Sequence, residues 1–62
     1  MKVWLARDKD GKLYAYDKKP LRQELYGFFT AGVKDGKIIE VFSELYKEVT
    51  WLNSPILVEH KI

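Results

Sequence analysis

Residues 3–16 decide the fold, and they read Val3-Trp4-Leu5-Ala6-Arg7-Asp8-Lys9-Asp10-Gly11-Lys12-Leu13-Tyr14-Ala15-Tyr16. An Asp-Gly pair between two apolar runs is the strongest short-range signature of a β-hairpin. A three-residue loop over 9–11, with Gly11 in the left-handed conformation of a G1 bulge, pairs Leu5 with Ala15 and Trp4 with Tyr16. This register predicts an aliphatic face (Val3, Leu5, Leu13, Ala15) and a second, mostly aromatic face (Trp4, Ala6, Tyr14, Tyr16).

The same four letters return at Lys34-Asp35-Gly36-Lys37. With residues 34–36 as the loop, the sequence predicts a second hairpin between 26–32 and 37–42. Ala31 then lies opposite Ile39, and Phe29 opposite Val41. This loop also requires a positive φ at Gly36.

Residues 37–49 support a second interpretation. Their apolar positions recur at helical spacing, which is typical of an amphipathic helix. No Ser, Thr, Asp or Asn directly precedes Lys37 to cap such a helix. The strand at 37–42 is the preferred prediction, and an α+β fold with a helix at 37–49 is the alternative.

Two prolines mark the remaining breaks. Pro20 ends the second strand, and it suits the first position of one helical turn over 20–24. Pro55 precedes a closing run over 56–61. The strands predicted near 2–7, 12–17, 26–32, 37–42 and 56–61 make residues 1–62 a single, mainly β domain. We expect a small antiparallel sheet or an SH3-like barrel of about five strands with one short helical turn.

Composition narrows the function. The 62 residues contain no cysteine and one histidine, His60, which excludes thiolate and histidine-rich sites. Asp8-Lys9-Asp10-Gly11 matches the start of a calcium loop, but the remaining ligands of that loop are missing, so turn chemistry explains it better. A chain this short has little room for a catalytic pocket. We expect no enzymatic activity, no cofactor and no metal.

Charge and hydropathy bear on partners and location. The net charge is +2, but residues 1–23 carry seven basic and three acidic groups, a balance of +4. No apolar run approaches the length that spans a bilayer, and the first residues lack the apolar stretch of a signal peptide. The sequence predicts a cytoplasmic protein without membrane contact.

Two stretches resemble a group of small, uncharacterised bacterial and prophage proteins. Residues 4–14, with Lys19-Pro20, are similar to the opening W-x-A-R-D-x-D-G-x-L-x-L and the later K-P pair of that group. Residues 48–59 are similar to its ending E-V-T-W-E-x-x-P-x-x-V-E, although Lys47 and Leu52 depart from the pattern. The resemblance covers a little under half of the chain. It implies a turn over 43–48 and an accessory or host-directed role, and it implies no activity.

The aromatic face is the candidate partner-binding surface, formed by Trp4, Tyr14 and Tyr16 with the neighbouring Arg7. Trp, Tyr and Arg are enriched at the energetic centres of protein interfaces. Two apolar faces on one hairpin exceed what a 62-residue monomer needs. We therefore predict a non-enzymatic protein-interaction module that binds another protein or a second copy of itself. Two alternatives are a small β-barrel that stacks single-stranded nucleic acid on these rings, and a purely structural role in which Trp51 and residues 21–26 cover them.

Overall fold

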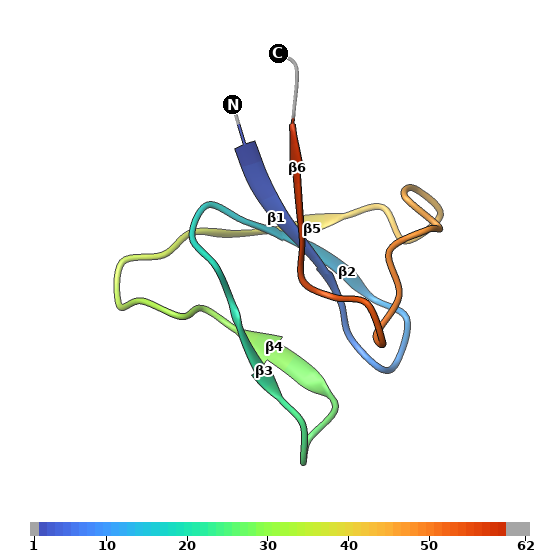
Figure 1. Ribbon diagram of the computed structural model, residues 1–62, viewed down its shortest axis with the longest axis horizontal. Coiled ribbons are helices and arrows are strands. Elements are labelled where there is room, and N and C mark those ends of the chain that lie inside the picture. The colour runs from blue at the N-terminus through green and yellow to red at the C-terminus, as the bar shows by residue number, and fades with distance from the viewer. Residues whose placement is uncertain (1, 60–62) are drawn as a thin grey trace.

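The computed structural model describes residues 2–59, and it is mainly β, as the sequence predicts (Figure 1). Its strands are β1 (Lys2–Arg7), β2 (Leu13–Tyr16), β3 (Leu21–Gln23), β4 (Phe28–Thr30), β5 (Ile38–Val41) and β6 (Ile56–Glu59). Four of them form an antiparallel sheet in the order β5-β2-β1-β6, and β3 pairs with β4 in a separate two-stranded sheet. The described strands form no closed barrel. Residues 2–59 contain no helix, so none there is long and apolar enough to cross a membrane.

The first hairpin has the predicted register. Leu5 lies opposite Ala15 and Trp4 lies opposite Tyr16. Gly11 adopts a φ of 97°, and its N–H donates to the Asp8 carbonyl at 2.9 Å. The three-residue loop is therefore confirmed. Its conformation follows from local chemistry, because a glycine pays no Cβ penalty in the left-handed region.

The predicted second hairpin is wrong. β4 pairs with β3 instead, and β5 lies on the outer edge of β2, with Ala15 opposite Ile39. Asp17 fixes this arrangement, because its carboxylate accepts the Lys37 N–H at 2.7 Å and its own N–H donates to the Lys37 carbonyl at 3.3 Å. Residues 34–36 still form a turn, but the strands on either side of it enter different sheets. Gly36 does not have the predicted positive φ; among the described residues, the glycines that do are Gly11 and Gly27.

Two further expectations need correction. The predicted helical turn over 20–24 is wrong, because Leu21–Gln23 is β3, and the predicted alternative of a helix at 37–49 is also wrong. Residues 24–27 connect β3 to β4, and Gly27 closes that loop with a φ of 77°. The closing strand is present as β6, which pairs with β1. Its predicted residues 60 and 61 lie outside the described part of the chain.

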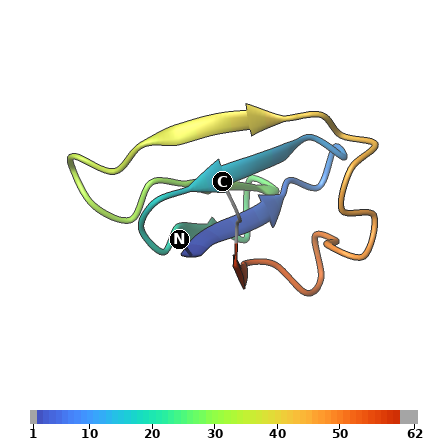
Figure 2. The ribbon, with the colours of Figure 1, turned by 90° about the horizontal axis from the view of Figure 1, so that it is seen from above.

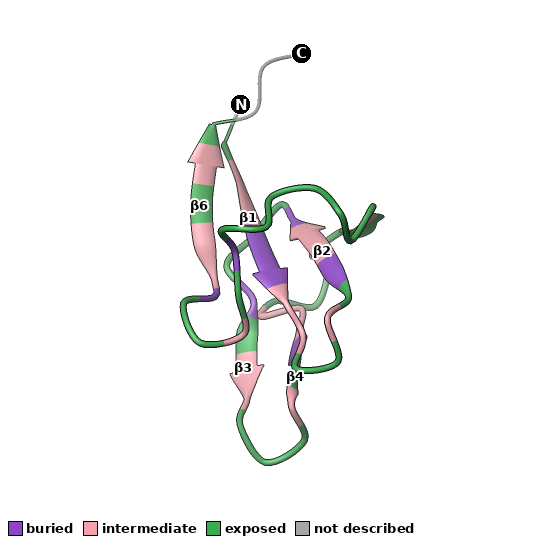
Figure 3. Cartoon of the chain, turned by 90° about the vertical axis from the view of Figure 1, so that its right-hand side faces the viewer, coloured by how far each residue is buried: buried purple, intermediate pink, exposed green. Residues whose placement is uncertain are grey.

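Each face of the four-stranded sheet has its own small core. Figure 3 marks the buried residues in purple. On the aliphatic face, Leu5 and Leu13 pack against Val49 from the long connection between β5 and β6. On the aromatic face, Ala6 and Tyr16 pack against Phe29 from β4. The β3–β4 hairpin therefore forms a second layer over part of the aromatic face. A groove remains between this hairpin and the part of the face that it does not cover.

Candidate functional site

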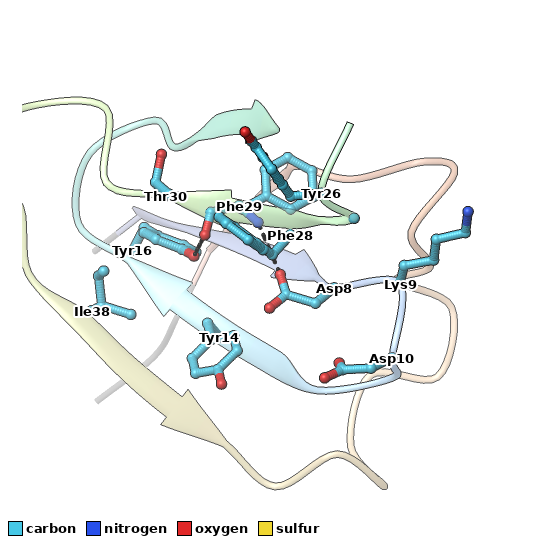
Figure 4. A pocket seen from close by; sticks show the side chains of 11 residues that line it. Asp8, Lys9, Asp10, Tyr14, Tyr16, Tyr26, Phe28, Phe29, Thr30 and Ile38 are labelled. Carbon is cyan, nitrogen blue, oxygen red and sulfur yellow. Dashed lines mark hydrogen bonds between the residues drawn. The ribbon is translucent and has the colours of Figure 1, made fainter. Parts of the chain in front are cut away.

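An open groove of about 660 Å³ lies between the β3–β4 hairpin and the aromatic face of β2 and β5 (Figure 4). We call it the aromatic groove. Its walls are mostly aromatic and aliphatic, and one end carries the turn between β1 and β2. The lining residues are Asp8, Lys9, Asp10, Tyr14, Tyr16, Tyr26, Gly27, Phe28, Phe29, Thr30 and Ile38.

Three hydrogen bonds hold the hairpin over the sheet and so determine the shape of the groove. The Lys9 N–H donates to the Gly27 carbonyl at 2.9 Å, and the Phe29 N–H donates to the Asp8 carboxylate at 3.0 Å. The Tyr16 hydroxyl donates to the Phe29 carbonyl at 3.2 Å. All three join residues far apart in the chain, so the groove exists only in the folded protein.

The upper wall of the groove consists of accessible rings. Tyr26 is 69% exposed and Phe28 is 40% exposed, and their rings stack with centroids 5.7 Å apart. Ile38, 48% exposed, forms the opposite margin on β5. A large apolar area is thus left open to solvent along the groove.

The end of the groove is acidic. Burial raises the pKa of Asp8 above its ordinary value of 3.8; the hydrogen bond from Phe29 opposes this shift, and the nearby Asp10 carboxylate reinforces it. Figure 4 shows the Asp8 carboxylate directed into the groove and the Lys9 ammonium directed away from it. Burial also raises the pKa of Tyr16 to about 12, with the Asp8 charge as the next cause, so this phenol stays neutral.

The four predicted partner-binding residues lie in different environments in the structure. Tyr14 is half-buried and lines the groove. Tyr16 is only 3% exposed, so it belongs to the core and presents almost no surface to a partner. Trp4 is half-buried outside the groove, where the Lys19 ammonium lies 5.5 Å from the centre of its ring.

Arg7 is a structural residue, which corrects its assignment to the partner-binding surface. Its side chain lies on the aliphatic side of the sheet, and its guanidinium donates to five backbone carbonyls. The distances are 2.6 Å to Val49, 2.7 Å to Gly11, 3.0 Å to Ser43, 3.0 Å to Leu45 and 3.1 Å to Tyr46. A guanidinium has five N–H donors, so none is left for a ligand.

The residues that pack over the aromatic face partly match the structural alternative, in which Trp51 and residues 21–26 cover the rings. Trp51 packs edge-on against Phe29 with ring centroids 5.4 Å apart. The Arg22 guanidinium lies 3.8 Å from the centre of the Trp51 ring and donates to the Trp51 carbonyl at 2.6 Å. The main cover, however, is Phe29 on β4. It leaves Tyr14 only half-buried, and this is where the groove lies.

Sequence reasoning missed Tyr26 and Phe28 as groove residues, because it placed both in a strand paired with 37–42. Gly27 between them is the signal that was available, since glycine is typical of a tight hairpin connection. Within residues 2–59, no three His, Cys, Asp or Glu side chains gather closely enough to hold a metal ion. No protein-family model matches the chain, and no curated protein or solved structure is significantly similar to it.

Proposed function

We propose that the protein is a non-enzymatic protein-interaction module whose aromatic groove receives a lysine or arginine side chain from a segment of a partner protein. The observation that carries this proposal is the position of the Asp8 carboxylate beside accessible aromatic rings in one open groove. The resemblance of both ends of the chain to prophage proteins suggests a bacterial host protein as the partner.

The chemistry of the groove suits a cation with an apolar stem. The faces of tyrosine and phenylalanine rings attract cations, by about 0.5–2 kcal/mol depending on solvent exposure. Asp8 and Asp10 add negative charge at one end. The methylene stem of lysine or arginine buries well along apolar walls while its charged head reaches a carboxylate. A partner segment with a basic residue beside apolar ones therefore matches both parts of the groove.

Selection from a displayed library of random peptides tests this function. We expect the selected peptides to be enriched in lysine or arginine next to apolar residues. Tyr26→Ala should weaken their binding, because it removes one exposed ring from the wall of the groove. Asp8→Asn should retain the hydrogen bond to Phe29 while losing the preference for basic peptides. Leu52→Ala is the matched control, since Leu52 is exposed and lies outside the groove.

Two outcomes would contradict the proposal: peptides that bind the Tyr26→Ala variant as well as the wild type, or a selected set without basic residues. A single-stranded nucleic acid is disfavoured as the ligand by the groove's carboxylates, which repel phosphate. Oligonucleotide binding that weakens steeply between about 50 and about 200 mM salt, with no selected peptide, would replace the proposal with the nucleic-acid alternative.

A further inference from the structure

The outer edge of β5 is a second surface that can bind another chain. β5 pairs with β2 on one side, and no strand in residues 2–59 pairs with its other side. Figure 2 shows β5, in yellow, at the margin of the four-stranded sheet with no other part of the chain beyond it. Ile39 is 67% exposed on one face of this edge, and Ile38 is exposed on the other. Such an edge is a template for pairing with a further strand.

The pairing of β5 with β2 determines which backbone groups point outward. The Asp17 N–H donates to the Lys37 carbonyl, so the backbone groups of Lys37 are directed toward β2. The direction of hydrogen bonding alternates along a strand. Ile39 therefore also faces β2, whereas Ile38 and Glu40 direct their N–H and C=O groups away from the sheet.

We propose that a second copy of the chain docks antiparallel on this edge, with Ile39 opposite Ile39 of the second copy. Ile38 then lies opposite Glu40 of the second copy, and Glu40 lies opposite Ile38 of the second copy. Both of these pairs exchange N–H···O=C bonds through the outward groups. The two Ile39 side chains meet at a non-hydrogen-bonded position, where paired Cα atoms are about 4.5 Å apart. A twofold axis perpendicular to the sheet generates this arrangement, which closes as a dimer.

The neighbouring registers are less favourable. A pair centred on Glu40 sets two carboxylates directly opposite each other, which destabilises a sheet. A pair centred on Ile38 requires Gly36 to extend the strand, but the Gly36 N–H donates to the Val33 carbonyl in the preceding turn. The register centred on Ile39 uses the outward groups of β5 without either penalty.

The dimer also bears on the aromatic groove, although it does not depend on the groove having a partner. Glu40 shares the sheet face of Tyr14, and Ile38 shares that of Tyr16. Glu40 of the second copy therefore comes to lie next to Ile38 at the margin of the groove. Self-association thus adds a carboxylate to a site that is already acidic, and it sets two grooves on one face of a continuous sheet.

Engineered cysteines test this register, because the natural chain has none. Under mild oxidation, most of the Ile39→Cys chain should form a disulfide-linked dimer, since the expected Cα separation falls within the range of about 4.4–6.8 Å that a disulfide spans. Ile38→Cys is the matched control and should remain largely monomeric, because Ile38 faces Glu40 of the second copy. Leu57→Cys, an exposed position on β6 at the opposite edge, should also remain monomeric.

The wild-type chain provides the second measurement. A short strand pair is smaller than the interface of about 1,200–2,000 Å² typical of stable complexes, so we expect its mass to rise reversibly from monomer to dimer with concentration. Glu40→Pro should hold it at the monomer, since proline removes an outward N–H without disturbing the pairing with β2. Tyr26→Ala should leave the mass unchanged, which separates this surface from the groove. A wild-type chain that stays monomeric, or equal cross-linking at positions 38 and 39, would overturn the proposal; so would cross-linking through Leu57→Cys.

Discussion

Replacing Arg7 should cost this small domain much of its stability. The Arg7 guanidinium joins the β1–β2 turn, through Gly11, to the connection between β5 and β6, through Val49 and residues 43–46. Arg7→Met removes all five donors and keeps a side chain of similar length to cover the apolar surface. Arg7→Lys keeps the charge but has only three donors on a single nitrogen.

The magnitude follows from which carbonyls lose a partner. The bonds to Ser43, Leu45 and Tyr46 lie at exposed positions, where water can replace the guanidinium. The bonds to Val49 and Gly11 are partly buried, and a bond from a charged donor contributes about 1.5–3 kcal/mol. Arg7→Met should therefore lower the free energy of unfolding by about 3–5 kcal/mol, and Arg7→Lys by about 2 kcal/mol. A 62-residue domain has about 3–9 kcal/mol in total, at 0.05–0.15 kcal/mol per residue.

Urea unfolding followed by tryptophan fluorescence measures this difference, and amide hydrogen exchange locates it. Exchange should accelerate most in residues 43–49, because the Arg7 guanidinium binds four backbone carbonyls of this connection. Lys12→Met is the control, since Lys12 is an exposed basic residue near the same turn. An Arg7→Met variant within about 0.5 kcal/mol of the wild type, as for an ordinary surface substitution, would refute the reasoning.

Four further predictions concern Asp8, Tyr16 and Gly32. Asp8→Ala should lower the free energy of unfolding by about 1–3 kcal/mol because it leaves the Phe29 N–H without an acceptor, whereas Asp8→Asn should not. Because the pKa of Asp8 is raised in the folded state, its contribution to stability should grow as the pH falls through that raised pKa and should be complete below pH 3.8. Asp8→Asn should remove this pH dependence when the free energy of unfolding is measured across acid pH. The pKa of Tyr16 is about 12 in the folded protein against about 10 in the unfolded chain. The stability that neutral Tyr16 contributes is therefore full below pH 10 and is lost as the pH rises through 12. In Tyr16→Phe, the midpoint pH of alkaline unfolding, followed by tyrosinate absorbance, should be higher than in the wild type. Gly32→Ala should destabilise the fold more than Gly36→Ala in thermal melts, because a Cβ at Gly32 would lie closer than 3.0 Å to the Lys19 carbonyl oxygen.

Of the four partner-binding residues predicted from the sequence, Tyr14 and Tyr16 line the candidate site, and the other nine lining residues were not predicted. Alternation along β2 places Tyr14 and Tyr16 on one face, and the structure keeps both there. Their separation into a groove residue and a core residue depends on where Phe29 lies. Nothing in the local pattern around residues 28–30 shows which face of which strand this ring will cover, because that choice depends on how β4 pairs.

The sequence by itself determined the β1–β2 hairpin. Asp10 and Gly11 favour one loop through interactions between residues a few positions apart, and the alternating side chains then select a single register. Only the tertiary structure decided the partner of β5 and the role of Arg7. The residues of 34–37 favour a turn as strongly as those of 9–12, yet β5 pairs with β2. Asp17 binds Lys37, and β4 pairs with β3, where it carries Phe29 onto the aromatic face. Local chemistry specifies turns, whereas strand partners are chosen by the burial and hydrogen bonding of the whole chain, whose contacts are distant in sequence.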